Sequence, residues 1–135
     1  MFLKDLNEEE KRNFLKLAVF IAKSDEDFAE DEKNMIEEYK YEMNLDYDPE
    51  ADDPLIDLNS LIENFNNSDE QTIKKIFIEL NGLALVDANF DKSEKEIFYQ
   101  FMKKHNLSEE YLKLVQDWLV KLNALYAEGV VLIKQ

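Results

Sequence analysis

The chain of 135 residues has no cysteine and only two glycines and two prolines. Without cysteine it can form no disulfide, no thiolate metal site and no thiol redox centre. Glycine and proline mark tight turns and strand ends, so their scarcity argues against a sheet-rich fold. We therefore expect an all-α protein, and the length suits a single compact domain, 1–135, with its own core.

Positive charge is also scarce. Sixteen lysines and arginines stand against 31 aspartates and glutamates, which gives a formal net charge of −15. Such a surface repels phosphate and anionic lipid headgroups, and it attracts cations or basic proteins. We therefore predict no nucleic-acid partner.

Long apolar runs are absent as well. The longest, Leu17 to Ala22, is far shorter than the ~20 residues that span a bilayer. Residues 1–10 contain no apolar segment of the signal-peptide type. We expect a soluble, cytoplasmic protein without direct membrane insertion.

One short phrase occurs twice in the chain. Asp25–Lys33 and Asp87–Lys95 share an aspartate, a phenylalanine, a glutamate and a lysine at matching places, 62 residues apart. The same offset continues without a gap and aligns Met35 with Ile97, Ile36 with Phe98, Tyr39 with Phe101, Asn44 with Asn106 and Leu45 with Leu107. This pattern is typical of a repeated helix-loop-helix unit.

Apolar residues at spacings of three and four predict about six helices. The first repeat covers about 7–45, an acidic connector covers 46–57, and the second repeat covers about 68–107. Within them we expect helices at 7–23 and 30–43, a short helix near 58–65, one starting after Ser68, and one at 92–105. The capping boxes that should begin two of these helices are Asn7 with Glu10 and Ser68 with Gln71.

The inward faces follow from the same spacing. They are predicted to be Phe14, Leu17, Ala18 and Ile21; Met35, Ile36, Tyr39 and Met43; Leu58, Leu61, Ile62 and Phe65; Ile73, Ile76, Phe77, Leu80, Leu83 and Ala84; and Ile97, Phe98, Phe101 and Met102.

The segment 108–128 is apolar around much of its circumference. We expect Ser108 to cap it and the helix to be central, packed by neighbours on several sides. Gly129 is expected to end it, and Val130 to Ile133 to dock as an apolar tail on the body or on a second subunit.

Oxygen-bearing side chains gather in the two repeated loops. The candidate metal ligands are Asp25, Asp27 and Glu32 in the first loop, and Asp87, Asn89, Asp91 and Glu94 in the second. With one histidine and no cysteine, the chain favours Ca²⁺ or Mg²⁺ over Zn²⁺ or copper. If the two loops converge, mutual repulsion of their acids favours a bound cation. The sequence leaves open whether they do.

Asp25 and Asp87 carry the strongest argument for an ion. Each is expected at the C-terminal end of a helix, where the macrodipole is negative, and each continues an inward face, where a charge loses hydration. A compensating group is therefore expected near each. It is a loop N–H, a lysine such as Lys33 or Lys95, or a bound cation.

Helix capping is the competing interpretation of the same residues. Asp91 and Glu94 suit the N-cap and third positions of a helix, and Glu32 occupies the corresponding place in the first repeat. Asp27 and Asn89 are common turn residues. Under this interpretation the loops bind no specific metal, and the chain serves as a protein–protein interaction or adaptor domain.

An EF-hand is not supported. Asp87, Asn89 and Asp91 match the first three ligand positions of that loop, but its glycine position holds Lys92 and its bidentate glutamate position holds Phe98.

The pattern Ala-x-x-Asp-x-x-Phe-x-x-x-Glu occurs at Ala22, Asp25, Phe28 and Glu32, and again at Ala84, Asp87, Phe90 and Glu94. It resembles the family of TerB-like tellurite-resistance proteins over about residues 10 to 126. The resemblance implies a small all-helical domain with two such helix pairs, a link to tellurite resistance and stress responses, and loop acids that bind divalent cations. It implies functional roles for Asp25, Glu32, Asp87 and Glu94. Because family members also occur fused to membrane-linked or co-chaperone modules, it further implies a membrane-associated complex as a partner.

Two departures from the family pattern concern the loops. The glycine that follows the family's aspartate is Glu26 in the first loop and Ala88 in the second, and Ala29 replaces a capping hydroxyl. A loop geometry that needs positive φ is therefore not favoured.

Catalysis is not expected. No serine stands with a partner base, and His105 aligns with Met43, which favours a place at the rim of the core. We expect a non-enzymatic, acidic stress-response module with Ca²⁺ or Mg²⁺ as its ligand and a basic or apolar protein as a further partner.

Overall fold

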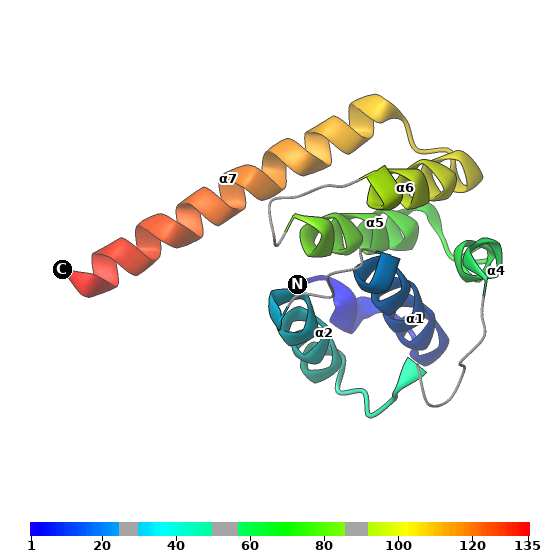
Figure 1. The fold of residues 1–135 in the computed structure, drawn as a ribbon, viewed down its shortest axis with the longest axis horizontal. Helices are drawn as coiled ribbons and strands as arrows, with labels where there is room; N and C mark the ends of the chain where they lie inside the picture. Colours follow the sequence, from blue (N-terminus) through cyan, green and yellow to red (C-terminus); the bar gives the residue numbers. More distant parts are fainter. Residues whose placement is uncertain (25–29, 50–56, 86–91) are drawn as a thin grey trace.

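The computed structural model describes residues 1–24, 30–49, 57–85 and 92–135. No strand occurs within these ranges, so the described chain is all-helical, as predicted. Figure 1 shows its elements, which are η1 (Leu3–Asp5), α1 (Glu8–Ser24), α2 (Glu30–Met43), α4 (Leu58–Glu63), α5 (Glu70–Ala84), α6 (Lys92–His105) and α7 (Glu109–Lys134).

Helix α1 is at the centre of the body and packs against α2, α4, α5 and α6. Its start is the predicted capping box: the Asn7 N–H donates to Glu10 Oε1 at 3.0 Å, and the Glu10 N–H donates to Asn7 Oδ1 at 2.8 Å. Its predicted inward residues are fully buried, and three more apolar residues outside that prediction are buried as well. The buried apolar residues of α1 are Phe14, Leu15, Leu17, Ala18, Val19, Ile21 and Ala22.

The helix boundaries follow the 62-residue offset. Helices α2 and α6 both have 14 residues, and their first residues are 62 positions apart, as are those of α1 and α5. Both α2 and α6 end at a left-handed residue, Asn44 with φ 51° and Asn106 with φ 58°. In both, the N–H of the next leucine donates at 2.9 Å to the carbonyl five residues earlier. The two helix ends therefore have the same geometry.

The inward faces of the later helices form the rest of the core. Met35, Leu58 and Ile73 are partly buried against it. The other predicted inward residues are buried, namely Ile36, Tyr39, Met43, Leu61, Ile62, Phe65, Ile76, Phe77, Leu80, Leu83, Ala84, Ile97, Phe98, Phe101 and Met102.

Phe77 lies at the middle of an aromatic group. Its ring centroid is 6.0 Å from that of Phe98, 5.8 Å from that of Phe101 and 6.0 Å from that of Tyr111. These contacts join α5 to α6 and α7.

The cap predicted for α5 is wrong by one residue. Asp69, and not Ser68, is the N-cap, and its Oδ1 accepts from the Thr72 N–H at 2.7 Å. The hydroxyl of Ser68 instead donates to Glu10 Oε2 at 2.7 Å, which ties the start of α5 to that of α1. Aspartate caps as well as serine does, and its charge also interacts favourably with the helix dipole.

The prediction of a central C-terminal helix at 108–128 is wrong. Ser108 does cap α7, accepting from the Tyr111 N–H at 3.0 Å, but the helix lies on the body only along its first part and then projects from it (Figure 1). Gly129 does not end the helix, which runs on to Lys134. One interior glycine costs about 1 kcal/mol relative to alanine, which is not enough to end a helix of 26 residues.

The Val130–Ile133 segment is therefore helical and does not dock on the body. Its outer residues are among the most exposed apolar side chains described, with Leu132 at 69% and Ile133 at 85% exposure. None of the described helices combines the length and the apolar character that a membrane-spanning segment needs.

Two glutamates fasten the N-terminal segment between α2 and α5. Glu79 is buried, accepts from the Phe2 N–H at 2.7 Å and lies 3.0 Å from the Met1 ammonium. Glu42 accepts from the Leu3 N–H at 2.9 Å and also pairs with that ammonium. The fully buried Leu3 is thereby held in the core.

The aromatic group around Phe77 gives a test of the fold. We expect Phe77→Ala to lower the free energy of unfolding by about 3–5 kcal/mol, because it removes a fully buried ring and leaves a cavity. Phe77→Leu, which keeps most of the volume, should cost clearly less. Tyr41→Ala is the control, since Tyr41 is 90% exposed and its loss should change stability by less than about 0.5 kcal/mol. Urea unfolding measures all three, and equal effects of Phe77→Ala and Tyr41→Ala would contradict this packing.

Candidate functional site

Glu32 is the third residue of α2, and it is 1% exposed. The helix turns Ile36, Tyr39 and Met43 into the core. Because residues three and four apart share a helix face, this inward face extends back to Glu32. Its carboxylate therefore starts a face that is otherwise apolar.

Glu94 occupies the corresponding place in α6. It is the third residue of that helix and is 0% exposed, and both of its carboxylate oxygens are shielded from solvent. Ile97, Phe98 and Phe101 continue the same face into the core. Two of the seven predicted metal ligands are therefore buried, at positions 62 residues apart.

In the other helices, the third residue is not buried. The third residues of α1, α4, α5 and α7 are Glu10, Ser60, Thr72 and Tyr111, and each of them is partly or largely exposed. The capping residues Asn7, Asp57, Asp69 and Ser108 are exposed too. Helix capping in the described part of this chain thus takes place at the surface. Capping alone does not account for the burial of Glu32 and Glu94.

The remaining predicted ligands, Asp25, Asp27, Asp87, Asn89 and Asp91, lie outside the described residues, as do the loop phenylalanines Phe28 and Phe90. The helix ends around the two loops are described. In Figure 1 the C-terminal end of α5 and the N-terminal ends of α2 and α6 lie toward the same side of the body, the side toward which α7 projects. Within the described ranges, no three acidic or histidine side chains are grouped so that they could hold a metal ion.

Burial makes the charge of these two carboxylates costly. Removing an ionised carboxylate from water costs several kcal/mol unless positive charge or hydrogen-bond donors compensate. The N-terminus of a helix supplies some compensation through its dipole and free N–H groups. A carboxylate held there out of water is also a hard oxygen ligand, of the kind that Ca²⁺ and Mg²⁺ prefer.

Two buried polar residues on α5 were not anticipated from the sequence. Glu79 has the structural role described above. Asn81 is fully buried, and its Nδ2 donates to the Phe77 carbonyl at 2.8 Å. The spacing of the inward face could have found both, because Glu79 lies between Ile76 and Leu83, and Asn81 between Phe77 and Ala84, at steps of three and four residues.

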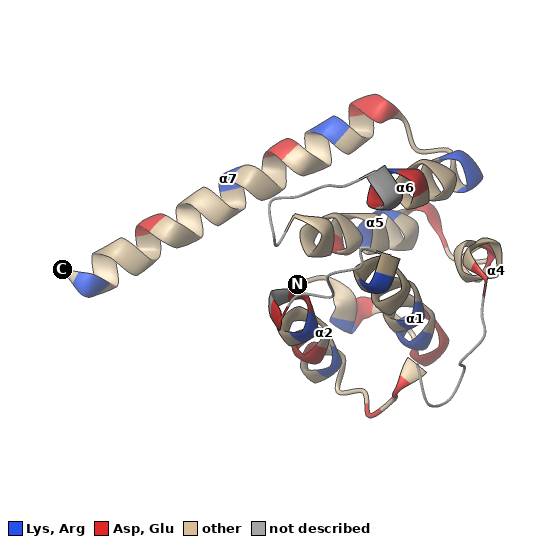
Figure 2. Cartoon of the chain, in the orientation of Figure 1, with Lys and Arg blue, Asp and Glu red and all other residues tan. Residues whose placement is uncertain are grey.

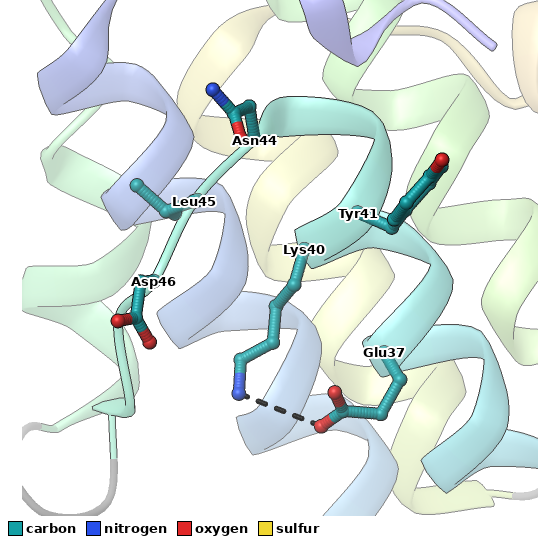
Figure 3. Close-up of a pocket in the computed structure, with 6 residues that line it drawn as sticks. All are labelled: Glu37, Lys40, Tyr41, Asn44, Leu45 and Asp46. Carbon is teal, nitrogen blue, oxygen red and sulfur yellow. Dashed lines mark hydrogen bonds and ion pairs between the residues drawn. The ribbon is translucent and has the colours of Figure 1, made fainter.

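A surface hollow of about 700 Å³ lies at the far end of α2 from Glu32 (Figure 3). Lys40 and Glu37, one turn apart on α2, pair at 3.5 Å on one wall of the hollow, while Tyr41 points away from them. None of the predicted site residues lines it. Its wide opening and its single exposed ion pair offer no set of converging groups for a ligand.

The described serine hydroxyls have local structural roles. Ser24 Oγ donates to the Ile21 carbonyl at 2.7 Å, Ser60 Oγ donates to Asp57 Oδ2 at 3.2 Å, and Ser68 and Ser108 act at helix starts as described above. None of these hydroxyls is bonded to a histidine.

His105 lies at the rim of the core, as the sequence predicts. Its Nε2 donates to the Ile62 carbonyl at 3.0 Å, and its ring centroid is 4.7 Å from that of Phe101. Burial lowers the pKa of His105 below its usual value, and the hydrogen bond to Ile62 opposes this effect only in part.

Comparison of the chain with protein-family models, with curated proteins and with solved structures gives no match.

The lowered pKa of His105 predicts a dependence of stability on pH. Because the folded-state pKa lies below the unfolded-state value of about 6.5, the contribution of the neutral ring is complete above that pH and is lost as the pH falls toward the folded-state pKa. We expect the wild type to lose more stability than His105→Gln over that window in urea unfolding. His105 is the only histidine, so no other imidazole contributes. Parallel pH profiles would contradict the assignment.

Proposed function

We propose that this chain is a non-enzymatic, acidic stress-response module, similar to the tellurite-resistance proteins, and that its two repeated loops bind Ca²⁺ or Mg²⁺. The link to tellurite and stress rests on the sequence resemblance alone. The observation that carries the ion-binding part is the burial of Glu32 and Glu94, at 1% and 0% exposure, one at the start of each helix that follows a repeated loop.

The chemistry of the chain supports an ion of this kind. The two glutamates are anionic oxygen ligands, and the adjacent loops hold five more oxygen-bearing side chains that the sequence assigns to the site. The net charge of −15 raises the local concentration of cations around the whole molecule. A bound divalent cation offsets the cost of dehydrated carboxylates. If the two loops converge, their acids would repel each other without it.

Thermal unfolding with and without Ca²⁺ or Mg²⁺ tests the proposal. An ion at 100 times its dissociation constant stabilises the folded state by about 2.7 kcal/mol, which for a chain of this size raises Tm on the order of 10 °C. We expect this shift in the wild type and its loss in the double variant Glu32→Gln/Glu94→Gln. The quantity compared between the two proteins is the ion-dependent shift in Tm, and not the stability without ion.

The matched control is Glu30→Gln/Glu96→Gln, which removes the same charge from exposed positions on the same two helices. It should keep the full shift. The single variants decide the number of sites: with one shared ion either substitution abolishes the shift, whereas with two separate ions each leaves about half of it. An equal shift in the wild type and in Glu32→Gln/Glu94→Gln would disprove the assignment, as would a wild type that does not respond to either ion.

A second candidate is an interaction or adaptor domain without a specific metal. The observation that favours it is the exposed apolar end of α7. Two results would favour this candidate over the first. The wild type would not respond to either ion, and Glu32→Gln/Glu94→Gln would change nothing but stability.

A further inference from the structure

The projecting part of α7 continues an apolar stripe that the body covers only in part. Leu112, Val115 and Leu119 are at most 9% exposed and hold the first part of the helix against the body. The stripe goes on at alternating steps of three and four residues, through Leu122, Tyr126, Gly129 and Ile133. This is the seven-residue repeat of a helix that packs lengthwise against another helix.

Beyond Leu122 no described part of the chain covers the stripe. Tyr126 is 76% exposed and Ile133 is 85% exposed, and Leu125 and Leu132 widen the same apolar side. A projecting helix of about 15 residues is marginal in water without a packing partner. The projecting part of α7 thus has an exposed apolar face, and packing against a neighbouring helix would stabilise it.

Gly129 also indicates that α7 packs against another helix. It lies inside the helix, where glycine costs about 1 kcal/mol relative to alanine. A Cβ added there meets nothing within 4 Å, so no contact with the described part of the chain explains the glycine. A glycine on an apolar stripe is expected where a large side chain of another helix approaches closely.

The charge distribution of the chain favours one kind of partner for the projecting segment over another. The projecting segment 120–135 has two lysines and one glutamate, while nearly all the acids are on the rest of the chain (Figure 2). An anionic lipid surface would be repelled by that acidic body. A second copy of the chain can pair tail to tail and keep its acidic body away.

We infer that two copies pair antiparallel through the projecting parts of α7. In the register that places Tyr126 of one copy against Gly129 of the other, Leu122 of one copy meets Ile133 of the other, so a large residue faces a small one in each central layer. The two acidic bodies then lie at opposite ends of the paired helices. A parallel pair would bring the bodies side by side, which like charges oppose.

The body has a groove at the place where this register puts the end of the second copy. A cavity of about 380 Å³ is lined by the apolar side chains of Met35, Ile78, Leu85, Leu119 and Leu122 together with the buried Glu79. Leu122 is both part of this groove and the residue that meets Ile133 of the other copy. The last turn of each tail therefore lies in a groove of its partner, and the arrangement is the same on both sides, as two-fold symmetry requires.

Sedimentation analysis over a dilution series tests the pairing. We expect the wild-type mass to change from 16.0 kDa to twice that value with increasing concentration. Tyr126→Glu/Ile133→Glu places two charges on the stripe and should weaken the dimer more than about tenfold. The control Ala124→Glu/Val131→Glu adds the same charge on the opposite side of the helix and should leave the dissociation constant within about twofold.

The variant Gly129→Leu distinguishes a specific dimer from nonspecific hydrophobic association. It adds apolar surface and improves helix propensity, but its side chain collides with Tyr126 of the other copy. We expect it to weaken the dimer. If association is merely hydrophobic, the same substitution strengthens it, and that result would overturn the proposed register.

Cross-linking reads the direction of the pair directly, because the chain has no cysteine of its own. A mixture of Leu122→Cys and Ile133→Cys chains should form a disulfide-linked heterodimer on mild oxidation, while Ile133→Cys alone should not. In the antiparallel register two copies of position 133 are separated by about 11 residues, or roughly 16 Å, too far for a disulfide. Efficient linking of Ile133→Cys to itself would indicate a parallel pair. A wild type that stays monomeric at every soluble concentration, whether or not it binds vesicles, would rule out the pairing.

Discussion

The burial of α1 is the constraint on which the rest of the fold depends. Its apolar residues point in several directions, and seven of them are buried, so a single neighbouring helix could not cover them. Helices α2, α4, α5 and α6 each take one side of it. Helix α7 has no place around α1: it packs on α5 with its first part and then leaves the body, although its sequence is the most apolar of the late helices.

The same constraint explains why two glutamates are inside. Each large apolar side chain that α2 and α6 bury contributes about 1.5–3 kcal/mol, and together these residues fix the rotation of each helix about its axis. Once Ile36 and Tyr39 face inward, the residue one turn earlier faces inward too, and in both helices it is a glutamate. The helix dipole and the N–H groups of the first turn reduce the cost of this placement. A divalent ion would reduce it further, because two positive charges then meet the dehydrated carboxylates directly.

The sequence predicted those features of the fold whose determinants all lie within the sequence pattern itself. The bounds of α2 and α6 were predicted to the residue, because the repeat fixes each end twice and Asn44 and Asn106 suit a left-handed helix end. The burial of Glu32 and Glu94 was missed: the inward faces were started at the first apolar residue, although one turn further back leads to each glutamate. Ser68 and Asp69 are adjacent residues that both cap well, so the sequence could not separate them. The course of α7 was missed for a different reason: apolarity all round a helix shows that cover is needed, but not which molecule provides it.

If both proposals hold, ion binding and tail pairing affect each other little, because the two regions are far apart. A chain with a net charge of −15 resists self-association, and each bound divalent ion would reduce that charge by two. At physiological salt, however, exposed charges interact over only about 8 Å. The paired segment from Leu122 to Ile133 alone is roughly 16 Å long, so an antiparallel pair holds the acidic bodies beyond that range. The dimer should therefore depend weakly on salt and on Ca²⁺, and pairing that strengthened steeply with either would place the two bodies in contact instead.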